Sequence, residues 1–328
     1  MISSPGKQFG RTGTIRLVDT SSLHVVQRIH YPHGTPEGLA FSPDSATLAV
    51  GAWNGRLSES AVRLWDVVSG KPMTSSLPGI RPGDVMFATE FSPDGSTLVG
   101  GARVLGPERG RIYLWSLGTP APLVDRFEAR RPVNDLAFAP DGSLLMAPTG
   151  WADGGDLLIW DTGARTTLKT IHADDAAAYS VDVSNDGRTV VTGGQSSSVR
   201  LWDIALGAPL GSPLTGLTGS ADTVDIGPDG STVLGADTAG NVLLWDVATG
   251  TIIGDPFPGP ASEEYLAASF TPDGRSVVVV SDAGSGWFWD VDPSDWKTRA
   301  CQIAGRSLTP QEWQEFLPDR PYHATCGS

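Results

Sequence analysis

The sequence is poor in the residues that most often carry chemistry. Its 328 residues include two cysteines and five histidines. It contains no Gly-x-Ser-x-Gly elbow, no phosphate-binding loop and no His-Glu-x-x-His zinc motif. His30 and His33 form a close pair, but no third ligand follows at a suitable spacing, so a solvated loop is favoured over a metal site. We therefore expect no cofactor and no catalytic centre.

Long apolar runs are also missing. No stretch approaches the roughly 18 apolar residues that a membrane-spanning helix requires, and no signal-peptide pattern is present. The formal charge is −14 and the pI about 4.6, which argues against nucleic acid or an anionic membrane surface as the main partner. We expect a protein or peptide ligand, no nucleic acid and no direct membrane insertion within this chain. Any membrane anchor is expected upstream of Met1.

Glycine and proline, by contrast, are abundant, with 40 and 25 copies, and many of them mark a turn that recurs along the chain. Aspartates at these turns are 43 to 50 residues apart, and the tryptophans that close the units are 42 to 50 apart. A period of about 40 to 45 residues with strand–turn–strand content is typical of propeller blades. The residues concerned are Asp44, Asp94, Asp141, Asp186, Asp229 and Asp273, with Trp65, Trp115, Trp160, Trp202, Trp245 and Trp289.

Each unit is predicted to form a tight hairpin followed by a third strand. In residues 91–100, Pro93 sets φ at the first turn position, Asp94 accepts bonds from nearby backbone N–H groups, and Gly95 accepts a positive φ. The first unit departs from the pattern because Ser45 replaces the glycine. The third strands are apolar with little alternation, as expected where both sheet faces pack on neighbouring blades.

These units resemble WD repeats from about Thr14 to Asp290. The resemblance implies an all-β fold, a WD-repeat β-propeller of the seven-bladed type, as one domain over residues 14–290. The Gly-His pair of many WD repeats is missing, and only His172 lies near such a place. The buried aspartate of the family is expected at Asp237 and Asp282. The repeat endings that carry the resemblance are Val62–Asp66, Val199–Asp203 and Val242–Asp246.

The first blade is predicted to be incomplete. Thr14–Asp19 resembles a third strand with Val18 in place of tryptophan, and His24–Ile29 resembles a fourth. Met1–Arg11 is too short and too rich in glycine, proline and serine for an inner hairpin. Either the N-terminal strands close the ring against the last unit, or the chain is the end of a longer polypeptide cut inside a blade. The second explanation is favoured, because the usual closure exchanges one strand and not two.

Residues 291–328 are predicted to be a helical tail. Asp292-Pro293 and Gly305 bound a helix over about 293–304. Residues 309–312, Thr-Pro-Gln-Glu, form a capping box that opens a second short helix, ending near Leu317. Two apolar faces this short cannot form a separate core, so we expect the tail to pack on the propeller.

The tail also holds both cysteines, Cys301 and Cys326. Residues 296–326 resemble the tail that ends many actinobacterial WD-repeat proteins, whose propeller follows a signalling NTPase of the STAND class or another regulatory module. The resemblance and the even cysteine count favour a disulfide, although cytosolic thiols normally stay reduced. A bridge would imply a propeller outside the cytoplasmic membrane behind an upstream anchor, so the localisation stays open between the two faces of the membrane.

The sequence predicts a non-catalytic protein-interaction platform, the sensor or regulatory module of a larger bacterial signalling protein. The loops before the third strands are the expected binding surface, and the longest are 52–61, 102–111 and 149–156. Exposed tryptophan and arginine are enriched in binding hot spots, although the tryptophans could equally cover gaps between blades. The predicted partner-binding residues are Trp53, Arg56, Arg103, Arg109 and Trp151.

The alternative is a propeller enzyme, a lactonase-like hydrolase with a metal in the central channel. Glu90, Asp182 and Asp225 occupy equivalent places, three residues before the turn proline or asparagine. Three carboxylates on the innermost strands could hold a cation. Carboxylates that are hydrated or bonded to groups beside the channel are the favoured explanation.

Overall fold

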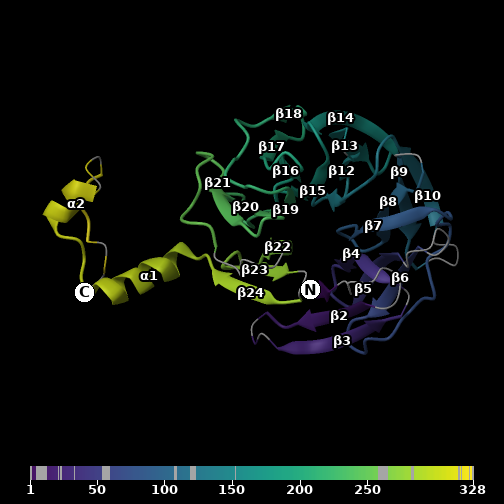
Figure 1. Ribbon diagram of the computed structural model, residues 1–328, viewed down its shortest axis with the longest axis horizontal. Helices are drawn as coiled ribbons and strands as arrows, with labels where there is room; N and C mark the ends of the chain where they lie inside the picture. The colour runs from purple at the N-terminus through teal and green to yellow at the C-terminus, as the bar shows by residue number, and fades with distance from the viewer. Residues whose placement is uncertain are drawn as a thin grey trace.

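A computed structural model describes residues 2–4, 13–20, 22, 24–32, 34–53, 60–106, 109–118, 123–151, 153–257, 265–281, 284–316, 318, 320–324 and 326. The strands of this part form seven antiparallel sheets, arranged radially about a central axis (Figure 1). The predicted all-β propeller of the seven-bladed type, with a short helical tail, is confirmed.

Strands follow one another within each blade, because tight turns join antiparallel neighbours. The first three sheets comprise β1 (Ile2–Ser4), β2 (Gly13–Val18) and β3 (Val25–Tyr31); β4 (Thr35–Phe41), β5 (Thr47–Trp53) and β6 (Ala61–Asp66); and β7 (Asp84–Phe91), β8 (Thr97–Val104), β9 (Arg109–Ser116) and β10 (Leu123–Ala129). The fourth and fifth comprise β11 (Ala137–Phe138), β12 (Leu144–Trp151), β13 (Gly154–Asp161) and β14 (Thr166–Asp174); and β15 (Ala178–Val183), β16 (Thr189–Gly194), β17 (Val199–Asp203) and β18 (Ala208–Pro209). The last two comprise β19 (Ala221–Ile226), β20 (Thr232–Asp237) and β21 (Val242–Asp246); and β22 (Tyr265–Phe270), β23 (Ser276–Ser281) and β24 (Gly286–Asp290).

The hairpin turns between the first two strands form as predicted. In the third blade, Ser92 Oγ and the backbone N–H of Ser96 donate to Asp94 Oδ1 at 2.6 and 3.0 Å, and Gly95 has φ 71°. Ser45 occupies the same turn position in the second blade with φ 60°. The turn therefore keeps its left-handed geometry where the glycine is replaced, although an L-residue enters that region at a cost.

The closing tryptophans form the cores between blades, and glycines on the neighbouring strand make room for them. Trp115 and Trp245 are fully buried. A Cβ at Gly100 would lie 2.8 Å from the Trp115 ring, and one at Gly235 would lie 2.8 Å from the Trp245 ring. A side chain at either glycine would therefore displace the tryptophan next to it.

The outermost strand is less regular than expected. Propeller blades typically have four strands, but in the described part of the chain β10, β14 and β18 alone supply fourth strands. Single bridges, Trp65 to Pro72 and Trp245 to Ile252, replace the fourth strand in the second and sixth blades. Pro72 has no N–H to continue a ladder, which accounts for the first of these interruptions.

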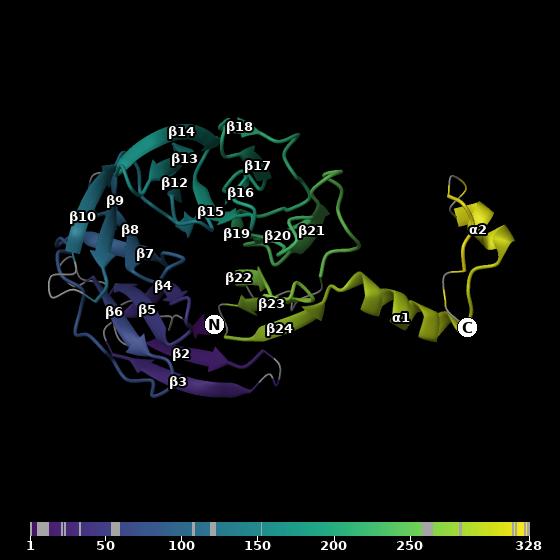
Figure 2. The ribbon, with the colours of Figure 1, turned by 180° about the vertical axis from the view of Figure 1, so that it is seen from behind.

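The first blade has one strand more than predicted. Residues 2–4, within the segment that is too short for an inner hairpin, pair antiparallel with β2 from Ile2 opposite Arg16 to Ser4 opposite Thr14. Within the described ranges this sheet has no fourth, innermost strand. The sheet lies beside β24 in Figure 2, and Arg16 Nη1 donates to the Gly284 carbonyl of the last blade at 3.3 Å. The N-terminal strands thus lie against the last unit.

The two helices form within one residue or so of their predicted bounds, but they point away from the sheets. α1 (Pro293–Ala304) leaves the last blade, and α2 (Pro310–Phe316) lies beyond it, in contrast to the expected packing on the propeller (Figure 1). Neither helix is long and apolar enough to cross a membrane.

The tail has its own small set of contacts, which explains why it can stand apart from the blades. Trp313 is buried, donates its indole N–H to the Arg320 carbonyl at 2.7 Å and packs edge-on against His323. The Sγ atoms of Cys301 and Cys326 are bonded to each other.

Candidate functional site

The three long loops are shorter than the sequence suggested, because the strands continue into them. Val104 pairs with Arg109 across the β8–β9 hairpin, and Trp151 pairs with Gly154 across β12–β13. Arg103, Arg109 and Trp151 therefore lie on strand ends and not in loops. All three lie at the ends of their strands away from the Pro-Asp turns.

Two of the predicted partner-binding residues lie together. The Arg103 guanidinium carbon is 3.9 Å from the centroid of the Trp151 ring, so a cation–π contact joins the third and fourth blades. Trp151 is 37% exposed and Arg103 is half-buried. The remaining predicted residues are not part of this pair: Trp53 ends β5 in the second blade and is half-buried, Arg109 is exposed, and Arg56 lies outside the described residues.

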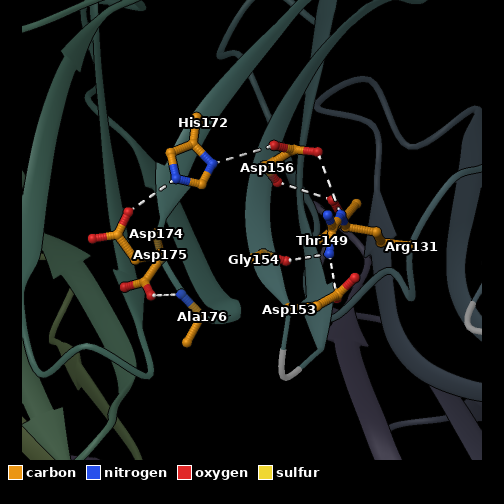
Figure 3. Close-up of polar contacts among 9 residues, drawn as sticks. All are labelled: Arg131, Thr149, Asp153, Gly154, Asp156, His172, Asp174, Asp175 and Ala176. Carbon is orange, nitrogen blue, oxygen red and sulfur yellow. Dashed lines mark hydrogen bonds and ion pairs between the residues drawn. The ribbon is translucent and has the colours of Figure 1, made fainter.

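Arg131 anchors this rim, although the sequence did not single it out (Figure 3). It lies between β10 and β11 and pairs through Nη1 with Asp153, and the same atom donates to the Gly154 carbonyl at 2.9 Å. Its Nε is 3.7 Å from Asp156 Oδ2. The arginine therefore holds the tip of the β12–β13 hairpin, next to Trp151. Its position two residues after the end of a fourth strand is the only sequence signal that could have identified it.

A second anchor holds the β8–β9 hairpin. Arg111 Nη1 is 2.5 Å from Oδ1 of the buried Asp84, and its Nε is 2.7 Å from Glu128 Oε1. The hydrogen bond from Arg111 lowers the pKa of Glu128. Burial, together with the hydrogen bond to Asp84, raises the pKa of Tyr113 to about 12. Arg111, Asp84, Glu128 and Tyr113 thus pair with one another and fix the β8–β9 hairpin next to its tip.

Carboxylates also fix the turns on this rim in the later blades. Asp237 is fully buried, as predicted, and accepts from the backbone N–H groups of Thr218 and Gly219 at 2.8 and 2.9 Å. At the end of β14 in the fourth blade, Asp174 takes this role by accepting from the backbone N–H of Ala176 at 2.8 Å. His172 Nε2 lies 3.1 Å from Asp175 Oδ1 (Figure 3). Asp282, the other predicted position, lies outside the described residues.

The inner carboxylates join successive blades. The Ile226 N–H donates to Asp182 Oδ2 at 2.8 Å, and the Phe270 N–H donates to Asp225 Oδ2 at 2.6 Å. Burial raises the pKa of Glu90 to about 8, with a smaller contribution from the charges of nearby carboxylates. Burial likewise raises the pKa of Asp225 to about 8, helped by Asp182.

A fourth inner carboxylate, Asp135, was missed because its spacing to the turn differs. It accepts from the Val181 N–H at 3.1 Å, and burial raises its pKa to about 7. Among the described residues, no three histidine, cysteine or acidic side chains are grouped so that they could hold a metal ion. The geometry of the inner carboxylates is that of links between blades.

Comparison with known proteins agrees with this architecture. Residues 122–161 and 165–203, which include Arg131, Trp151 and His172, match the family model described as WD domain, G-beta repeat. The chain is similar to Protein groucho of Drosophila melanogaster, 25% identical over 156 residues, covering 46% of this chain and 20% of that protein. It is similar to Transcription factor unc-37 of Caenorhabditis elegans, 31% identical over 156 residues, covering 45% and 24%.

The matches thus span about a fifth to a quarter of the length of these curated relatives. The family-model match falls on two repeats whose closing tryptophans, turns and sheets have been described above. Together these observations support a protein-interaction or regulatory module, and its fold is an all-β WD-repeat propeller.

Proposed function

We propose that this propeller is a non-catalytic platform that binds a protein or peptide across the tips of β8–β9 and β12–β13. The observation that carries the proposal is the stack of Arg103 on Trp151, 3.9 Å from guanidinium carbon to ring centroid. Tryptophan and arginine are the side chains most enriched at binding hot spots. Here they come from two different blades and leave part of their surface exposed.

The anchors below these tips support the same surface. Arg111 with Asp84, and Arg131 with Asp153, fix the two hairpins before a partner arrives. Binding groups that are already ordered lose less conformational entropy on association. A preorganised rim is therefore suited to capture a ligand.

The test is capture of a partner by the immobilised chain from a lysate of the source cells. Replacing Arg103 and Arg109 together with glutamate is expected to abolish capture and to leave the melting temperature within about 2 °C of wild type, since both residues lie at the rim. The matched control replaces Arg165 and Arg188, exposed arginines on turns of the opposite rim, with glutamate. Equal capture by both variants contradicts the proposed surface, and a large loss of stability in the first variant assigns its arginines a structural role.

We further propose that the propeller is the sensor or regulatory module of a larger bacterial signalling protein. The resemblance of residues 296–326 to tails of multidomain signalling proteins supports this role. An antibody raised against the propeller is expected to detect, in source cells, a polypeptide much larger than the 34.4 kDa of this chain. A single band near that mass contradicts the proposal.

The bond between Cys301 and Cys326 supports a position of the module in an oxidising compartment. Mass spectrometry of unreduced protein from the source cells is expected to find a peptide pair joined through these cysteines. Two free thiols in that material remove the support for a location outside the cytoplasmic membrane.

A further inference from the structure

The charge of the third blade differs from that of the rest of the chain. The whole sequence has a formal charge of −14. Residues 103–131 nevertheless contain six arginines and three acidic residues, a balance of +3. The six arginines are Arg103, Arg109, Arg111, Arg126, Arg130 and Arg131.

The topology brings most of these arginines to one rim. Arg103 and Arg109 lie at the tip of the β8–β9 hairpin, and Arg130 lies directly after β10, which ends at the same rim. Arg103 pairs opposite Gly110 and Arg109 opposite Val104, so their side chains leave the hairpin on opposite faces. Each face of the β8–β9 hairpin therefore carries one arginine near the tip.

Three carboxylates that the structure describes beside this rim are already engaged. Asp84 and Glu128 pair with Arg111, and Asp153 pairs with Arg131. Among the residues that the structure describes, no ion pair joins Arg103, Arg109 or Arg130 to a carboxylate. Arg109 and Arg130 are exposed. Three guanidinium groups thus keep N–H donors available for an external anion.

The stack on Trp151 leaves the hydrogen-bonding edge of Arg103 available. A guanidinium on an aromatic face is held in place through its flat side, while its N–H groups lie in the plane. In-plane donors suit the paired oxygens of a carboxylate or a phosphate. Trp151 therefore fixes Arg103 in an orientation in which it can receive an oxyanion.

The opposite rim has the reverse character. The carboxylates of its Pro-Asp and Asn-Asp turns accept hydrogen bonds from neighbouring hydroxyl and N–H groups, which lower their pKa. These side chains are therefore ionised at neutral pH and repel an anionic ligand. An acidic segment approaching the propeller is directed towards the rim of the third blade.

We infer that the tip of β8–β9, with Arg103, Arg109 and Arg130, binds an acidic stretch of the protein partner. This inference rests on the platform proposed above and names the chemistry of its ligand. The shared group is an oxyanion, supplied by glutamate and aspartate side chains or by phosphorylated serines.

The test uses three fluorescein-labelled peptides of ten residues with alternating glycine, in which the other positions are glutamate, phosphoserine or glutamine. Fluorescence anisotropy in 50 mM salt is expected to detect binding of an acidic peptide and none of the glutamine peptide. Affinity is expected to fall several-fold at 200 mM salt, because exposed charges are then screened. Tighter binding of the glutamate or of the phosphoserine peptide identifies the source of the oxyanion.

The double variant Arg103→Gln with Arg109→Gln, which replaces two charged side chains with neutral ones, is expected to lower the affinity for the acidic peptide at least tenfold. Arg165→Gln with Arg188→Gln removes the same charge from the opposite rim and is expected to change the affinity less than twofold. Equal weakening by both variants, or no binding of either acidic peptide to the wild type, overturns the inference. A protein partner could still be captured in an Arg103-dependent way although neither acidic peptide binds. That result would support the proposed platform and contradict only the inference that its ligand is acidic.

Discussion

The third and last blades are built from the same repeat, yet their cores differ. Trp115 closes the third blade and is fully buried, whereas the equivalent Trp289 is only partly buried. A cavity of about 350 Å³ lies beside the last blade. Its lining is mostly apolar and comes from β22–β24 together with Val18, Thr20 and Phe41 of the first two blades. We call this junction the seam.

The difference shows that a blade is only as well buried as its neighbours are complete. The third blade lies between two sheets whose strands fill both of its faces. The last blade faces the N-terminal sheet, which has no innermost strand among the described residues. The same repeat pattern therefore gives different burial, because the burial of a closing tryptophan depends on the neighbouring blade as well as on its own repeat.

The largest expected effect compares the two closing tryptophans. Trp115→Ala is expected to lower the free energy of unfolding by about 3 to 5 kcal/mol, since it opens a cavity in a fully packed core. Trp289→Ala, which loses a half-buried ring stacked on Phe257, is expected to cost roughly half as much. Urea unfolding followed by circular dichroism measures both. Equal losses would show that the seam is as tightly packed as the third blade.

A second comparison concerns the inner carboxylates, which stop at the seam. The third to sixth blades carry Glu90, Asp135, Asp182 and Asp225. In the last blade, Ser269 occupies the place that Glu90, Asp182 and Asp225 have before their turns. The folded protein raises the pKa of Glu90 to about 8 and of Asp135 to about 7, well above the value of about 4 in an unfolded chain. The native state thus holds protons that the unfolded chain releases, so stability falls as the pH rises from about 5 to 8.

Glu90→Gln removes one of these groups while keeping a similar shape. It is expected to raise the free energy of unfolding at pH 8 by roughly 1 to 3 kcal/mol, after discounting for partial exposure, and to change it little at pH 5. Glu315→Gln, at an exposed position on α2, serves as the control. Thermal unfolding of the wild type and the variants at pH 5 and pH 8 measures this change. An equal increase in stability at both pH values would contradict the proposed effect of burial on the pKa of Glu90.

How well each junction tolerates added volume gives a third comparison. Ala147 is fully buried in the fourth blade, and Ala267 is exposed and lines the seam cavity. Ala147→Leu is expected to destabilise the protein by about 1 to 3 kcal/mol through overpacking. Ala267→Leu is expected to cost less than about 0.5 kcal/mol or to stabilise slightly, because the cavity has room. Similar losses for the two variants would mean that the cavity cannot accept a side chain.

The sequence was sufficient for what is local and periodic. Pro93, Asp94 and Gly95 determine their turn among themselves, and each closing tryptophan marks its own third strand, so the repeat and the propeller could be predicted. The contact of Arg103 with Trp151 could not, because it joins two blades and depends on how far each hairpin extends. The pairing of the N-terminal strand could not be predicted either. Nor could the role of Arg131, whose partners lie 22 or more residues away.

The smallest expected effect concerns the one Pro-Asp turn without glycine. Ser45 has φ 60°, while Gly95 and Gly142 have φ 71° and 72° at the same place in the third and fourth blades. An L-residue in this region costs about 1 kcal/mol relative to glycine, and the entropy that glycine gains in the unfolded chain offsets part of that benefit. Ser45→Gly is therefore expected to stabilise the protein by roughly 0.5 kcal/mol, whereas Gly95→Ser should destabilise it by about 1 kcal/mol or more. Paired denaturation curves resolve the two changes, and a loss of stability in Ser45→Gly would show that the serine is better adapted to its turn than the glycine of the other blades.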